Sequence, residues 1–298
     1  MLNTIRQPIL WLLLVTGILG NLATLMILKY EKTLRTFTKM IFAMEAVCDV
    51  MWLTWKSIDR FYRYFHKRLE YFYMFSSAFQ YCSLLCAVVV ALERMCLLVW
   101  PTNLFIRRAA LKEAIIICSS LVLFTISLFG IRILWINQDN VLKIVIDNIL
   151  TNFLPPVVSL IFSAIFIHKF KTRVRRVNPI RQNHMNRLSL LLIKIVVVTS
   201  TFDFIVPIPM MCFDIVRIAR EKSIEKQVEE VVSLWFQLIW ISNFSLKFIL
   251  YIFFFPNFRK EFFVICKKVR NIFIRNWNIY IDTKIFQRLK SPGVKQIK

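Results

Sequence analysis

The sequence predicts an all-α membrane protein, in which a seven-transmembrane helix bundle is followed by a short amphipathic helix. Three observations support this fold class. Hydrophobic residues make up 58% of the 298 residues and the mean hydropathy is +0.60, which is more apolar surface than a soluble core can bury. Seven mostly apolar stretches meet or approach the roughly 20 residues that a spanning helix needs. Basic residues gather in alternate connections between these stretches, as in cytoplasmic loops.

The positive charge of the chain does not indicate a nucleic-acid-binding protein. The net charge is +23, but the basic residues lie between the apolar stretches, where they face anionic lipid headgroups. We therefore expect membrane lipids as partners and no nucleic acid. The cysteines are odd in number, and six of the seven lie within or at the edge of apolar stretches, so no extracellular disulfide framework is indicated. No cofactor and no metal site are expected.

The predicted spans are taken in chain order from the apolar stretches. Their connections are most basic after the first, third and fifth spans, and the fifth connection carries seven Lys or Arg and no acidic residue between 169 and 187. The positive-inside rule then places the N-terminus outside and the C-terminus in the cytoplasm of a multi-pass plasma-membrane protein. The spans lie near residues 8–29, 39–58, 71–100, 113–135, 146–168, 188–213 and 231–254.

Residues 255–268 predict a juxtamembrane amphipathic helix. Phe258, Phe262 and Ile265 share one helical face, with basic residues opposite, as in a helix that lies on the inner membrane surface. Cys266 at its end is a candidate for lipidation. We expect residues 269–298 to form a basic, loosely ordered cytoplasmic tail.

An acid–base pair, Glu93-Arg94, ends the third apolar stretch and is followed by Trp100-Pro101. A charged side chain near the middle of a spanning helix costs about 2.5–3.5 kcal/mol on insertion scales, so such a pair indicates a function. The alternative is that both side chains reach the headgroups and anchor the helix.

Short motifs in most of the predicted spans favour a functional role for the Glu93-Arg94 pair. Together they resemble the rhodopsin-like family of G-protein-coupled receptors, and the resemblance covers nearly the whole chain. It implies a receptor domain over residues 1–254, in a divergent, chemosensory-type member that transmits binding of an extracellular small-molecule or short-peptide ligand to a cytoplasmic heterotrimeric G protein. The matching residues are Gly20-Asn21, Ala46 with Asp49, Glu93-Arg94-Met95, Pro156, Pro207 and the segment from Asn243 to Tyr251.

The resemblance also implies roles for individual residues. Glu93, Arg94 and Tyr251 would serve G-protein coupling, with Arg94 paired to Glu93 at rest. An intramembrane polar centre would consist of Asn21, Asp49, Ser83, Asn243 and Lys247. The family holds sodium at such a centre, and here we hypothesise an Asp49–Lys247 pair in its place, because a buried charge needs a partner. Glu45, one turn from Asp49, is the competing partner, and the alternative is that Lys247 reaches the inner surface.

Aromatic and polar residues near the outer ends of the spans are candidates for a ligand pocket. Aromatic stripes also arise from helix packing alone, so that explanation stays open. The candidates are Trp52, Trp55, Ser76, Phe79, Phe202, Phe204 and Trp235.

Two other classes of function compete with a receptor. An ion channel or transporter could use the intramembrane charges Glu45, Asp49, Asp203 and Lys247, although the chain shows no internal repeat. An enzyme is not expected, because the three histidines are scattered and no His-Glu-x-x-His motif or nucleophile elbow is present.

Overall fold

A computed structural model of the chain describes residues 2–30, 34–64, 70–99, 111–136, 149–174, 183–206, 208–209, 212, 226–254 and 256–290. Within these ranges the chain is almost entirely helical and contains no strand. The elements are α1 (Leu2–Tyr30), α2 (Thr36–Tyr64), α3 (Glu70–Val99), α5 (Leu111–Ile136), the π-helical turn η1 (Ile149–Phe153), α7 (Leu154–Val174), α8 (Asn183–Ile205), α10 (Lys226–Phe254) and α11 (Pro256–Lys290).

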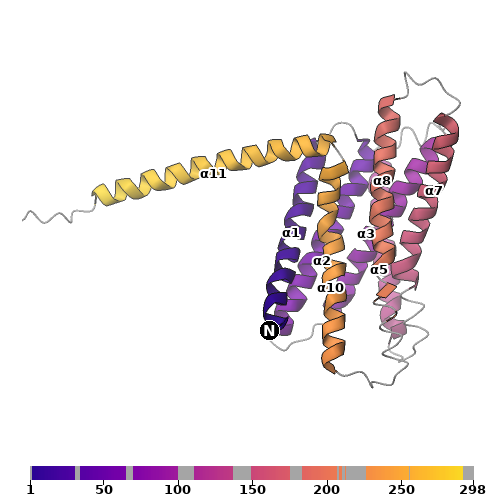
Figure 1. The fold of residues 1–298 in the computed structure, drawn as a ribbon, viewed down its shortest axis with the longest axis horizontal. Helices are drawn as coiled ribbons and strands as arrows, with labels where there is room; N and C mark the ends of the chain where they lie inside the picture. The colour runs from indigo at the N-terminus through magenta and orange to yellow at the C-terminus, as the bar shows by residue number, and fades with distance from the viewer. Residues whose placement is uncertain are drawn as a thin grey trace, which may run out of the picture.

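The helices α1 to α10 lie side by side in a bundle, and α11 projects from one end of it (Figure 1). α3 is the most central helix, in contact with α2, α5, α7 and α8, while α10 packs on α1, α2 and α8. The N-terminal end of α1 lies at the end of the bundle opposite to the start of α11 (Figure 1).

Several helices are built to face lipid. Leu12, Leu19 and Leu123 are each more than 60% exposed, an arrangement that is costly in water and favourable in a bilayer. Four segments of the described helices are long and apolar enough to cross a membrane: Pro8–Tyr30 in α1, Ser77–Val99 in α3, Lys112–Gly130 in α5 and Leu154–Thr172 in α7. The chain is therefore an all-helical membrane protein.

The remaining predicted spans coincide with α2, α8 and α10. Of these, α2 has the lowest mean hydropathy, and the described apolar segments Val196–Ile205 in α8 and Leu238–Phe254 in α10 are short. In α10 the segment Leu238–Phe254 meets the criterion only together with Phe258–Arg275, from which it is bent by 107°. α8 ends at Ile205 rather than near 213, just before Pro207, which lies outside the described residues. A residue before proline is disfavoured in the helical conformation, which explains the earlier end.

α11 is longer than the sequence predicts. It was expected to end at 268 and to be followed by a loosely ordered tail, but the helix continues to Lys290. The expectation was wrong because a weaker apolar pattern after residue 268 does not end the helix. No glycine or proline interrupts residues 257–290, and the next breaker is Pro292-Gly293.

Two glycines allow α1 to approach α10 and α2 closely. A Cβ atom on Gly17 would lie 2.8 Å from Leu53 Cδ1 and 2.9 Å from Ser245 Cβ, and one on Gly20 would lie 3.0 Å from Phe248 Cβ. Small residues at helix contacts are typical of membrane bundles, where close backbone approach replaces the hydrophobic effect as the source of packing energy.

Candidate functional site

Lys247 of α10 lies at the centre of a buried polar network. Its side chain is 1% exposed, and its ammonium Nζ lies 2.9 Å from Glu45 Oε1 and 3.2 Å from Asp49 Oδ2. The hypothesised pair with Asp49 is present in the structure, and the competing partner Glu45 shares the same ammonium. The alternative in which Lys247 reaches the inner surface is wrong, because the side chain is enclosed on all sides.

Ser83 and Tyr251 complete this network. Lys247 donates to Ser83 Oγ at 2.9 Å, and Ser83 in turn donates to Asp49 Oδ1 at 2.6 Å. The Tyr251 hydroxyl donates to Glu45 Oε2 at 3.1 Å. Glu45 and Asp49 are four residues apart on α2, and Lys247 and Tyr251 are four apart on α10, so each helix presents one polar face to the other. The network therefore joins α2, α3 and α10.

A second buried cluster surrounds Arg94 at the end of α3. The Arg94 guanidinium lies 3.5 Å from Glu93 and donates to Thr38 Oγ1 at 2.5 Å. Thr38 donates to Glu93 Oε2 at 2.8 Å, and Arg35 pairs with Glu93 Oε1 at 3.3 Å. Arg94 is 4% exposed as a residue, so it must leave Thr38 and Glu93 before it can contact anything outside the bundle.

Arg94 keeps unused capacity for hydrogen bonds. Its Nε is buried and has no hydrogen-bond partner among the described residues. A guanidinium offers five donors in a rigid fork, and a buried donor without a partner costs free energy. The cluster therefore holds Arg94 in place without satisfying all of its donors.

Asn21 joins α1 to α10. It donates to Gly17 O at 3.0 Å and to Phe244 O at 3.3 Å, and it is 1% exposed. Ser245 makes the reciprocal contact by donating to Leu13 O at 2.9 Å. A carbonyl oxygen inside a helix has a second lone pair for such a bond, so these side chains tie α1 to α10 without interrupting either helix.

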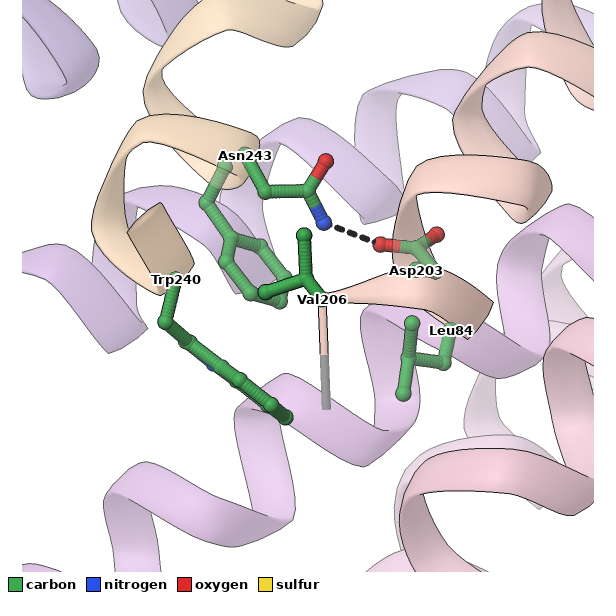
Figure 2. A pocket seen from close by; sticks show the side chains of 6 residues that line it. Leu84, Asp203, Val206, Trp240 and Asn243 are labelled. Carbon is green, nitrogen blue, oxygen red and sulfur yellow. Dashed lines mark hydrogen bonds between the residues drawn. The ribbon is translucent and has the colours of Figure 1, made fainter. Parts of the chain in front are cut away.

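Asn243 lies apart from the Lys247 network and binds Asp203 of α8. Figure 2 shows the Asn243 amide directed at the Asp203 carboxylate, to which it donates a hydrogen bond. The pair borders a small cavity with room for about one water molecule. The other lining residues are Leu84, Val206, Trp240 and Phe244.

Two of the residues expected to form a ligand pocket, Trp52 and Phe79, pack in the same hydrophobic cluster. Phe202 and Trp235 are 52% and 55% exposed, like lipid-facing side chains, and none of the seven candidates lines the cavity beside Asp203. The side chain of Ser76 lies outside the described residues. Trp52 is buried against Phe244, with ring centroids 4.5 Å apart, so it packs helices together.

The remaining candidates are only partly enclosed. Trp55, Phe79 and Phe204 are each half-buried, and Phe204 meets Phe153 edge to face at 5.8 Å. Cys266 is exposed on α11, and its lipidation stays a prediction.

Sequence reasoning missed the partners of Glu93 other than Arg94. Thr38 and Arg35 carry no motif, and a threonine in a spanning helix is ordinary. The available signal was their depth: both lie at the start of the second span, on the side where the third span ends, so adjacent antiparallel helices bring them level with Glu93.

The fold and the two clusters define a class of protein: a helical membrane protein with paired charges buried between its helices. Comparison of the chain with models of known protein families and with curated proteins found no match. The family suggested by the motifs is therefore part of the proposal that follows.

Proposed function

We propose that the chain is a divergent seven-span receptor of the rhodopsin-like, G-protein-coupled kind. It would bind a small molecule or short peptide on the outer side of the plasma membrane and activate a heterotrimeric G protein on the inner side. The observation that carries the proposal is the enclosed guanidinium of Arg94, which is held by Thr38 and Glu93 at the end of the bundle from which α11 starts.

Burial of charge supports seven spans even though α2, α8 and α10 do not meet the span criterion by themselves. These three helices carry Glu45, Asp49, Asp203 and Lys247, each of which is at most 5% exposed. A helix with its charges turned inward still presents an apolar surface to lipid. In the proposed arrangement each of α1, α2, α3, α5, α7, α8 and α10, which lie side by side (Figure 1), crosses the membrane once.

The mechanism follows from the bonds that Arg94 must exchange. In the resting arrangement the guanidinium is occupied by Thr38 and Glu93, which ties α3 to α2. Separation of the helices at this end would break the bond to Thr38 and free an arginine fork for the carbonyl groups of an inserted G-protein helix. By its place in the sequence, Arg187 near the start of α8 is basic where an acidic partner for Arg94 would be expected, so we expect a resting state that is held by few bonds.

The Lys247 network can transmit the signal across the bundle. Since its bonds join α2, α3 and α10, a shift of α10 on ligand binding changes the pairing of Lys247 with Glu45 and Asp49. Tyr251 ties the same network to the hydrophobic cluster around Val90, Phe42 and Phe258, which reaches the inner end of the bundle. A mechanical link of this kind needs two discrete arrangements rather than a continuous path.

The same charges weigh less in favour of a channel or transporter. Glu45 and Asp49 both bind the Lys247 ammonium, and Asp203 binds Asn243. In the described part of the bundle, the cavity beside Asp203 holds about one water molecule, whereas a conducting path needs a row of hydrated sites. Ion currents from the purified chain, without any G protein, would establish the channel instead.

The receptor proposal is tested by nucleotide exchange on G proteins. Full-length chain in nanodiscs is mixed with each major G-protein class, and exchange is measured without ligand. We expect basal exchange from the native chain, and a loss of about tenfold or more for Arg94→Ala, because hydrogen bonds to a charged group are worth about 1.5–3 kcal/mol. Arg94→Lys, which keeps the charge and loses the fork, is the matched control and should retain part of the activity. Equal exchange from native and Arg94→Ala protein of equal folding would remove Arg94 from the mechanism.

A further inference from the structure

α11 continues well past the point where it leaves the bundle. The first three to four turns contact α1 and α10, and the rest projects sideways with no contact to other described helices (Figure 1). At 1.5 Å per residue, its 35 residues give a helix about 50 Å long. The helix therefore extends well beyond the end of the bundle.

One apolar stripe runs from the packed part of α11 into the projecting part. Phe258, Phe262 and Ile265 pack against the bundle. The same helical face continues at spacings of three and four residues. The residues that continue it are Val269, Ile272 and Phe273, which are 56%, 56% and 67% exposed.

The packed part fixes the direction in which this stripe faces. Phe258, Phe262 and Ile265 contact the cluster that contains Ile27 and Leu28, at the end of α1. Lys268 holds its ammonium 5.7 Å from the centroid of the Tyr30 ring, so α11 crosses directly over the end of α1. The apolar stripe therefore faces along the bundle, toward the depth at which the spanning helices lie.

The surface of α1 beside that space is apolar. On α1 the apolar residues Leu19, Leu22 and Met26 are 61%, 42% and 50% exposed, which marks the outer surface of a spanning helix. α11 is bent by 107° from α10 and so runs nearly in the membrane plane. A helix in this position, with its apolar face toward the acyl chains, is an interfacial helix.

The charge of α11 indicates which lipids the helix would bind. Residues 256–290 contain nine Lys or Arg and two acidic residues. Basic residues at the cytoplasmic surface attract anionic lipid. We propose that residues 269–290 of α11 are an anionic-lipid-binding helix, which inserts Val269, Ile272 and Phe273 into the cytoplasmic leaflet beside α1. The proposal rests on the proposed topology, with the C-terminus in the cytoplasm, and not on receptor activity.

Spin labels on the full-length chain test the depth of this helix. Exposed Cys212 and Cys266 are replaced by serine, and single labels are placed by Val269→Cys, Ile272→Cys, Phe273→Cys, Arg270→Cys and Ile274→Cys. The chain is reconstituted in vesicles of phosphatidylcholine with and without phosphatidylserine. Collision rates with oxygen report depth in lipid, and those with a water-soluble nickel reagent report exposure to water.

We expect depth to oscillate with the helical period when phosphatidylserine is present. Nickel collisions at 269, 272 and 273 should fall about tenfold or more below those at 270 and 274, and the contrast should shrink by a similar factor without phosphatidylserine. Nickel collisions that are equally high at all five positions would overturn the proposal. An equal contrast in both vesicles would overturn its anionic-lipid part.

A pair of double variants separates insertion from general hydrophobicity. Ile272→Asn with Phe273→Asn removes the stripe and should return a label at 269 to the nickel collision rate of an aqueous site. Phe263→Asn with Ile274→Asn removes two exposed apolar residues, 62% and 49% exposed, from outside the stripe and should leave the label at 269 protected. The same loss of protection in both variants would contradict insertion through the stripe.

Discussion

Lys247 carries its charge in the interior of a membrane bundle, where its partners are two carboxylates and a hydroxyl. The Phe244 ring, with its centroid 4.9 Å from the ammonium, adds a cation–π contact. Removal of one member of a buried ion pair leaves the other charged and without a partner, at a cost of about 3–5 kcal/mol.

Lys247→Met is therefore expected to destabilise the chain by about 3–5 kcal/mol. The measurement is the thermal midpoint of the purified protein in detergent, followed by its tryptophan fluorescence. The control is the triple variant that also carries Glu45→Gln and Asp49→Asn, in which no charge is left unpaired, and it should recover most of the loss. A single variant as stable as the native chain would show that the ion pairs contribute little.

Thr38 is the residue that holds Arg94 in its resting position. Thr38→Val keeps the shape of the side chain but removes the hydroxyl that binds both Arg94 and Glu93. We expect basal nucleotide exchange on the G protein to rise about threefold or more, since one such hydrogen bond contributes about 0.5–1.5 kcal/mol.

Thr36→Val is the matched control for this prediction, because Thr36 lies on the same turn of α2 with an exposed side chain. It should leave basal exchange unchanged. A rise of the same size in both variants would assign the effect to helix propensity rather than to the release of Arg94.

At the scale of single residues, the sequence identified the buried charged side chains more reliably than the neutral side chains that bind them. Lys247, Asp49 and Arg94 stand out because charges are rare in apolar helices, and rarity alone indicates burial and pairing. Thr38 gave no such signal, since a threonine hydroxyl can bond to its own helix as readily as to a neighbour. Its role depends on how α2 is rotated against α3, which composition does not encode.

Among the helices, α1 depends on glycine for its contact with α10. Gly17→Ala would place a methyl group 2.9 Å from Ser245 Cβ of α10 and 2.8 Å from Leu53 Cδ1 of α2, and we expect a loss of about 1–3 kcal/mol from overpacking. The measurement is again thermal unfolding in detergent.

Gly130→Ala supplies the control, because a Cβ atom at Gly130 of α5 meets nothing within 4 Å. It should be neutral or stabilise the chain by about 0.5–1 kcal/mol through its higher helix propensity. If Gly17→Ala were equally harmless, α1 would not be held to α10 by close packing.

Helix positions were predictable to within several residues at most ends, but helix rotation was not. In a soluble protein the polar face of a helix marks the side that faces water. A spanning helix such as α10 is apolar on both the face toward lipid and the face packed in the bundle, so its rotation cannot be inferred from hydropathy. Phe202 and Trp235 were therefore assigned to a pocket, and the structure leaves them more than half exposed. The full length of α11 was not predictable for a different reason, because its apolar stripe ends near Phe273 whereas the helix continues to Lys290.

At the scale of the whole molecule, the number of crossings separates a receptor from most alternatives. Length and hydropathy alone find four spans in the described helices, or five if the bent pair of α10 and α11 is one span. α2, α8 and α10 do not meet that criterion by themselves, and they carry charges that the bundle encloses. These helices lie alongside α1 in the bundle, and the N-terminal end of α1 lies opposite the start of α11 (Figure 1). Both features favour an odd number of membrane crossings.

The side of the membrane on which each terminus lies is the most direct test of this account. Epitope tags are fused to the two ends of the full-length chain, and antibody binding is measured on intact and then on permeabilised cells. We predict that the N-terminal tag binds antibody on intact cells, and that the C-terminal tag binds it only after permeabilisation. If both tags became accessible together, the number of crossings would be even, and Arg94 could not stand at the cytoplasmic end of a seven-span receptor.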